Sequence, residues 1–212
     1  MIFRDRREAG QKLAEVMKAR GPEDPLVLAI PRGGVPIGCE LAKALHAPFD
    51  LIVPRKLPIP YNPEAGFGAV TPDGTVVLND SLVRELGLSQ REIDNIVMAV
   101  RDEVQRRVKA YRPGPPLDPR GRTVIITDDG LASGYTMIAA VRDVKRKAPM
   151  KVIVAVPCSP RSTVERLERE ADEVISLYVQ EYGSFAVASY YEEFTDLSDG
   201  QVLALLGTCP VS

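Results

Sequence analysis

Two adjacent carboxylates, Asp128 and Asp129, stand where a short apolar run of the chain ends. Residues 124–126 before them are β-branched and apolar, whereas residues 130–136 after them are small, contain glycine and are rich in hydroxyls. Free backbone amides at the beginning of a helix, flanked by Ser and Thr hydroxyls, bind anions. This combination predicts a ligand with a phosphate at one end and hydroxyls or a cation beside it, as in a phosphorylated sugar. The alternative is a buried strand followed by an ordinary helix cap at Asp129 or Ser133.

Two other turns carry charged residues directly after apolar runs. Arg32-Gly33-Gly34 follows residues 25–30, and its glycines allow the backbone to approach a phosphate that the arginine can chelate. Arg55-Lys56 follows residues 49–54 and precedes a proline-rich segment, residues 57–64, that we expect to be an exposed loop. The alternatives are a tight turn with a surface arginine in the first case and solvated charge in the second.

Strands and helices are expected to alternate along the chain. Mainly apolar runs predict strands at 25–30, 49–54, 124–127 and 151–156, of which 25–30 and 151–156 should be buried, and a short strand at 174–177. Capping patterns and helical spacing predict helices after Asp5, over 37–45, after Ser89, from 137 through 144, over 159–170 and over 198–206. Residues 66–70 and 75–78 flank a Pro-Asp-Gly turn and predict a hairpin, and residues 185–188 predict a short strand.

This alternation is typical of an α/β, three-layer fold with a central, mostly parallel sheet flanked by helices. Ligands of such sheets gather at the carboxyl ends of the strands. The turns at Arg32, Arg55 and Asp128 should therefore meet in one crevice.

Composition restricts the classes of protein to which this chain can belong. A length of 212 residues suits one domain, and a net charge of −2 gives no electrostatic reason to expect a nucleic-acid partner. The three cysteines, Cys39, Cys158 and Cys209, lack metal-type spacing, and the charged N-terminus lacks the apolar core of a signal peptide. We expect a cytoplasmic protein without a membrane span. The single histidine, His46, stands at a helix end beside Ala47-Pro48, where we expect a surface or packing role, so Ser-His and Cys-His catalysis are not expected.

The stretch from Val124 to Thr136 resembles the signature of the type I phosphoribosyltransferases, which bind phosphoribosyl pyrophosphate (PRPP). The resemblance implies that Asp128 and Asp129 bind the ribose hydroxyls. It assigns the 5-phosphate to the loop that follows, namely Ala132, Ser133, Gly134, Tyr135 and Thr136. Thr127 and Gly130 stand where the family usually has aliphatic residues.

The same resemblance extends to the other two turns. It assigns Arg32, Gly33 and Gly34 to pyrophosphate, with a cis peptide near Arg32 left open. It makes Arg55 and Lys56 the catalytic residues of a flexible flap over about residues 55–80, acting together with the two acids. A core over about residues 25–175 and a C-terminal hood over about 176–212, with a contribution from the N-terminus left open, complete the single domain.

The implied activity is that of a glycosyltransferase of nucleotide salvage. It transfers ribose 5-phosphate from PRPP to a nucleobase-like acceptor, or runs in reverse, and releases pyrophosphate. The Mg²⁺ cofactor is bound mainly through PRPP, with no metal ligand assigned to the protein. Ala132 stands where enzymes for 6-oxopurines usually carry Asp, whereas the aromatic tail resembles their hood, so the base stays open.

Two alternatives share the PRPP-binding signature. A regulator that senses PRPP without catalysis would keep the fold, but the Arg55-Lys56 pair favours catalysis. PRPP synthesis requires a longer, two-domain chain. A homodimer is left open, because flaps of this family often act across a dimer interface.

Overall fold

A central sheet of five parallel strands organises the computed structural model, which describes residues 2–112 and 114–210, without the side chains of residues 63 and 64. In spatial order the strands are β2 (Phe49–Leu51), β1 (Pro25–Ala29), β6 (Thr123–Thr127), β7 (Lys151–Pro160) and β8 (Glu173–Gln180). Every neighbouring pair is parallel. The predicted α/β fold with a parallel central sheet is thereby confirmed.

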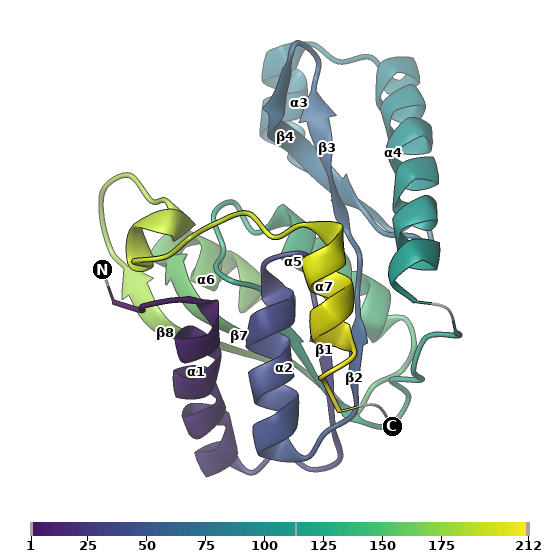
Figure 1. Cartoon of the computed structure of the whole chain (residues 1–212). Coiled ribbons are helices and arrows are strands. Elements are labelled where there is room, and N and C mark those ends of the chain that lie inside the picture. The colour runs from purple at the N-terminus through teal and green to yellow at the C-terminus, as the bar shows by residue number, and fades with distance from the viewer. Residues whose placement is uncertain (1, 113, 211–212) are drawn as a thin grey trace.

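Helices cover both faces of this sheet (Figure 1). One face is covered by α1 (Arg6–Arg20), α2 (Gly34–Leu45) and α7 (Asp199–Leu206), and the other by α5 (Tyr135–Lys145) and α6 (Arg161–Leu167). Alternate strand residues enter two separate apolar cores, because successive side chains of a strand point to opposite faces. Ile125 belongs to the core beneath α1 and α2, and Ile126 to the core beneath α5.

A second, antiparallel sheet stands above the first, together with two helices (Figure 1). Its strands are β3 (Arg55–Ile59), β4 (Asn62–Val70) and β5 (Val76–Leu78), and the helices are α3 (Asp80–Leu86) and α4 (Gln90–Tyr111). The expected hairpin between β4 and β5 is confirmed. Helix α3 was not predicted from the sequence, although Asn79 caps its first turn by accepting a hydrogen bond from the Leu82 amide.

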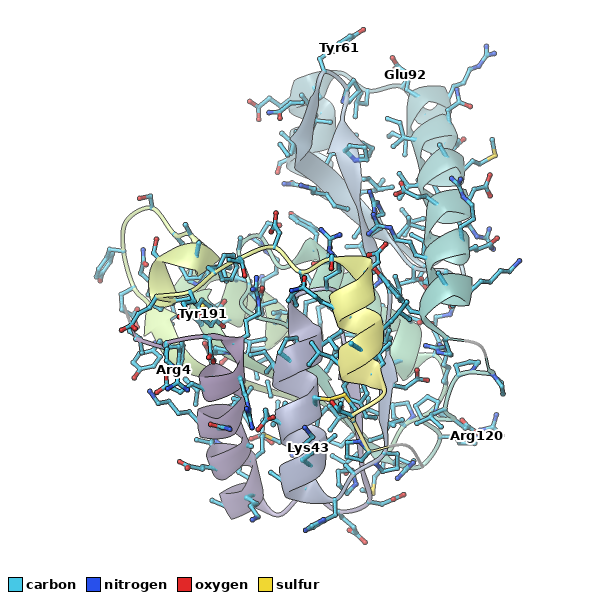
Figure 2. The ribbon with its side chains drawn as sticks, in the orientation of Figure 1. Arg4, Lys43, Tyr61, Glu92, Arg120 and Tyr191 are labelled. Atoms are coloured by element: carbon cyan, nitrogen blue, oxygen red, sulfur yellow. A yellow bond between two sulfur atoms is a disulfide. The ribbon has the colours of Figure 1, made fainter. Side chains whose placement is uncertain are left out.

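The proline-rich segment after Arg55-Lys56 is the tip of a β-hairpin rather than the exposed loop that was expected, because β3 continues to Ile59 and β4 begins at Asn62. Strand β3 pairs with β4, with register shifts on both sides of Pro58. Proline is tolerated in an edge strand and at bulges because it cannot donate a ladder hydrogen bond. Leu57 is fully buried, and Tyr61 projects from the tip of the hairpin into solvent (Figure 2).

The N-terminal segment is joined to the C-terminal part of the chain. The Phe3 amide donates to the Tyr190 carbonyl over 2.9 Å, and the Glu192 amide donates to the Phe3 carbonyl over 2.9 Å. Tyr191 thus lies beside the beginning of α1 (Figure 2). A 3-10 helix, Val187–Tyr190, replaces the short strand expected at residues 185–188. The division into core, flap and hood stays a prediction.

Cys39 of α2 and Cys209, which follows α7, form a disulfide. Their separation of 170 residues gave no indication of this bond in the sequence. It ties the C-terminal helix to the layer that covers the central sheet.

Helix caps follow the sequence closely. The side chains of Asp5 and Ser89 accept from backbone amides at the beginnings of α1 and α4, as predicted. Ser198 caps α7 in the same way, although only the approximate range of that helix was predicted from the sequence. The helix expected over residues 159–170 begins only at Arg161, because β7 continues through Pro160, and it ends at Leu167.

Candidate functional site

The chain reverses its direction of winding between β1 and β6, and the turns after these two strands lie against each other. β1 connects to β2 on one side, whereas β6 lies on its other side. Such a switch point opens a crevice at the carboxyl ends of the strands. The Ile30 amide donates to the Thr127 carbonyl over 2.9 Å, which holds the two turns together.

Glycine is required where these turns touch. A Cβ on Gly33 would lie 2.0 Å from Asp129 Oδ2, and a Cβ on Gly34 would lie 2.8 Å from the Thr127 carbonyl oxygen. The predicted pyrophosphate loop therefore lies directly against the predicted ribose acids. The peptide bond between Pro31 and Arg32 is cis, which resolves the question that the sequence left open.

The two acids differ in their partners. Asp129 Oδ2 accepts from Arg6 Nε over 2.8 Å, whereas Asp128 Oδ1 accepts from the backbone amide of Asp129 over 2.9 Å. Burial and the adjacent Asp129 charge raise the pKa of Asp128 well above its usual range. Burial also raises the pKa of Asp129, and the Arg6 guanidinium opposes that rise. The pair is thus costly to ionise fully, and a ligand offering hydroxyl donors would stabilise its charged form.

Thr127, the residue before the acids, has a fully buried hydroxyl that finds no hydrogen-bond partner within the described residues. Its methyl group faces the close contact between α2 and the sheet at Gly38. The position is apolar in its surroundings, in agreement with the aliphatic residue that the resemblance leads one to expect there.

The loop from Gly130 to Thr136 lines a cavity of about 420 Å³, together with Lys56 of β3. Gly134 adopts a left-handed conformation with φ of 78° and immediately precedes α5. Two contacts from α6 hold the loop: Thr163 Oγ1 donates to the Ala132 carbonyl and Arg166 Nη1 to the Ser133 carbonyl, each over 2.6 Å. Lys56 and the predicted phosphate loop thus face one space.

Arg55 and Lys56 are neighbours in the chain, but their side chains have different surroundings. Arg55 pairs with Glu103 of α4 over 3.0 Å, and burial lowers its pKa. Lys56 lies on the cavity side of β3.

Arg32 Nη1 lies 3.6 Å from Asp199 Oδ1 at the beginning of α7, and Asp199 also accepts from the Tyr111 hydroxyl. The pyrophosphate loop is thereby linked to the C-terminal helix.

Sequence reasoning missed Arg6, whose guanidinium contacts the Asp129 carboxylate from outside the strand-end turns. A signal was present, because Arg6 shares a helical face with Ala9, Gly10 and Leu13, which are buried.

Cys158 also lies close to the acids, and burial and the nearby carboxylates raise its pKa to about 12. Cys158 is therefore a thiol at neutral pH, as expected of a cysteine without a base.

Among the residues that the structure describes, no group of three or more His, Cys, Asp or Glu side chains is arranged to hold a metal ion. The described helices also include none that is long and apolar enough to cross a membrane.

The sequence-family model described as the phosphoribosyl transferase domain matches residues 72–192, which is more than half of the chain. The chain belongs to the phosphoribosyl transferase family. The matched segment contains Asp128, Asp129 and the loop to Thr136, whereas Arg6, Arg32 and Lys56 precede it.

Two relatives of this phosphoribosyl transferase domain cover nearly all of the chain. A Mycobacterium tuberculosis protein named "Putative phosphoribosyl transferase Rv0571c" is 41% identical over 97% of the chain. The chain spans 46% of that relative's length. The crystal structure of TT1426 from Thermus thermophilus is 39% identical, with a TM-score of 0.80, and the alignment covers 97% of this chain and 98% of that one.

Proposed function

We propose that the protein transfers the ribose 5-phosphate group of PRPP to a nitrogenous base and releases pyrophosphate, in nucleotide salvage in the cytoplasm. One observation carries this proposal: Gly33 and Gly34 lie against the paired acids Asp128 and Asp129 at the switch point of the sheet. The adjoining loop and Lys56 line the cavity beside them. The partners are PRPP and a nucleobase-like acceptor, and a homodimer stays open.

Each group has a role that its chemistry allows. Asp128 and Asp129 accept hydrogen bonds from the ribose hydroxyls, and the amides and hydroxyls of residues 132–136 bind the 5-phosphate. Arg32 and the amides beside Gly33 and Gly34 bind pyrophosphate. The base nitrogen forms a bond to the anomeric carbon while the carbon–oxygen bond to pyrophosphate breaks. The electron pair leaves with pyrophosphate, and a proton carried by the base nitrogen is released to solvent.

Charge at the two ends of the sugar favours this displacement. The transition state resembles an oxocarbenium ion, so the acids beneath the ring stabilise its positive charge. Lys56, brought over the cavity by β3, stabilises the negative charge that builds on pyrophosphate, and the hairpin excludes water. No covalent intermediate with the protein is required.

Mg²⁺ fits this site only through the substrate. The described residues offer two adjacent carboxylates and no three-ligand cluster, so the pyrophosphate and hydroxyl oxygens of PRPP would supply most of its oxygen ligands. When bound, the ion neutralises pyrophosphate and improves it as a leaving group.

The direct test incubates the protein with PRPP, Mg²⁺ and a panel of nucleobases and follows pyrophosphate release. Turnover with one base supports the proposal and identifies the acceptor. Lys56→Ala should mainly lower kcat, and Lys43→Ala, on the distant end of α2 (Figure 2), should leave it unchanged. A large loss of PRPP affinity in Lys56→Ala with kcat preserved would contradict the role given to Lys56.

Binding and turnover distinguish the alternatives. PRPP binding without turnover on any base would assign the chain to the PRPP-sensing regulators and refute catalysis. Absence of PRPP binding would refute both. Because the chain spans under half of its mycobacterial relative, the activity of a longer protein would also include what its other part contributes.

A further inference from the structure

Arg6 is a buried arginine at the beginning of α1, with 8% of its surface exposed. Its Nε lies 2.8 Å from Asp129 Oδ2, and its Nη1 donates to the Thr195 carbonyl over 2.8 Å. Its guanidinium carbon lies 4.0 Å from the centre of the Phe194 ring. Three contacts therefore hold the side chain, and one of them is with Asp129, a predicted ligand of the ribose.

The placement of Arg6 depends on both ends of the chain. The backbone pairing of Phe3 with Tyr191 positions the beginning of α1, and the Tyr191 hydroxyl donates to the Asp129 carbonyl over 2.6 Å. The Asp5 cap starts the helix so that Arg6 faces the core, while Arg7 faces solvent. Two segments far apart in the sequence thus deliver one guanidinium to the acid.

The contact constrains the direction of the Asp129 carboxylate. Oδ2 is held by Arg6 and also lies against Gly33, where a Cβ would come within 2.0 Å. With Oδ2 fixed, Oδ1 keeps a defined orientation and is the oxygen left for a ribose hydroxyl. The positive charge of Arg6 also offsets the repulsion between Asp129 and Asp128, two carboxylates on adjacent residues.

We propose that Arg6 is a positioning residue of the PRPP site, which holds the Asp129 carboxylate in the orientation that accepts a ribose hydroxyl and balances its charge. This inference rests on the proposed function. It makes the N-terminal helix, which lies outside the segment matched by the family model, part of the substrate site.

The first test compares PRPP binding and steady-state kinetics of the wild type with those of Arg6→Met, Arg6→Lys and Arg7→Met. Arg7 is the matched control, because it is the next residue of the same helix and its side chain is 71% exposed. Arg6→Met should weaken PRPP binding about tenfold or more, with the loss in KM for PRPP rather than in kcat. Arg6→Lys keeps the charge and should recover part of the affinity, and Arg7→Met should bind as the wild type does.

A second measurement does not depend on PRPP. Carboxyl ¹³C NMR of Asp129, assigned by its loss in Asp129→Asn, should show a pKa that rises by about one unit or more in Arg6→Met, because an adjacent arginine lowers a carboxyl pKa by about 1–3 units. In Arg6→Lys the pKa of Asp129 should lie between its values in the wild type and in Arg6→Met. The charged and titratable groups that face Asp129 are Arg6, Asp128, Cys158, Tyr191 and Asp196. Only Arg6 is changed in this comparison.

The outcomes separate this inference from the proposed function. A wild type that binds no PRPP refutes the proposed function and the role of Arg6 in it. If the wild type binds PRPP, equal affinity in a folded Arg6→Met variant overturns the positioning role, as does an unchanged pKa of Asp129. If Arg6→Met fails to fold, Arg6→Lys decides, because wild-type affinity together with a wild-type KM would show that the Nε geometry is not needed.

Discussion

Replacing Gly33 by alanine perturbs the meeting point of the two turns by a single methyl group. Gly33 has φ of −61° and ψ of −34°, values that alanine adopts without strain, so the backbone itself does not resist the change. The added Cβ would lie 2.0 Å from Asp129 Oδ2 and 2.4 Å from its Cγ, both impossible contacts. Either the carboxylate turns away or the loop moves.

The magnitude follows from what is displaced. Overpacking at such a contact costs about 1–3 kcal/mol of the free energy of unfolding. A lost hydrogen bond between the displaced carboxylate and a ribose hydroxyl costs about 1.5–3 kcal/mol, which weakens PRPP binding about 10- to 150-fold. Pyrophosphate alone should keep its affinity if only the carboxylate turns away, and should lose affinity as well if the loop that carries Gly33 moves.

Isothermal titration with PRPP and with pyrophosphate measures both effects, and urea unfolding measures the stability. Gly200→Ala is the control, because a Cβ there meets nothing within 4 Å. A Gly33→Ala variant that binds PRPP as tightly as the wild type would refute the placement of the acids beside this loop.

Three further predictions concern stability. Thr127→Val should raise the free energy of unfolding by about 1 kcal/mol, because the buried hydroxyl has no partner within the described residues, whereas Thr163→Val, which loses a hydrogen bond, should lower it; urea unfolding that ranks them the other way contradicts this. Burial and a hydrogen bond with the Asp73 carboxyl raise the pKa of Asp143 from 3.8 to about 6, so the folded state binds a proton that the unfolded state has released. The wild type should therefore lose up to about 3 kcal/mol of its free energy of unfolding as the pH rises between these values. Asp143→Asn should lack this slope, and an equal slope in both proteins would be inconsistent with the raised pKa. Reduction of the Cys39–Cys209 disulfide should lower the free energy of unfolding by about 5 kcal/mol, because its loop spans 170 residues; a melting temperature insensitive to reductant, with thiol titration confirming reduction, would count against it.

Local features of this fold could be predicted from the sequence because their causes are local. Asp5 and Ser89 cap helices by accepting hydrogen bonds from amides three residues further along the chain. A continuous apolar run indicates a strand that is covered on both faces of the sheet. The convergence of Arg32-Gly33-Gly34 with Asp128 and Asp129 follows from parallel strands sharing one carboxyl edge.

Features that depend on distant pairing could not be predicted in this way. The segment after Lys56 becomes a strand only because β4 lies beside it and bulges accommodate Pro58. The bond between Cys39 and Cys209 depends on where α7 docks. The spacing of apolar residues in α1 indicates that Arg6 is buried, but its contact with Asp129 depends on how α1 is aligned with the end of β6.

Calorimetric titration of PRPP into the wild type and into the double variant Asp128→Asn, Asp129→Asn measures whether the acids at the end of β6 form the PRPP site. We expect PRPP with Mg²⁺ to bind the wild type saturably and to be displaced by both ribose 5-phosphate and pyrophosphate, and we expect this binding to be lost in the folded double variant. Binding that survives the double substitution, or a wild type that binds no PRPP, would contradict a site formed where these strand ends meet.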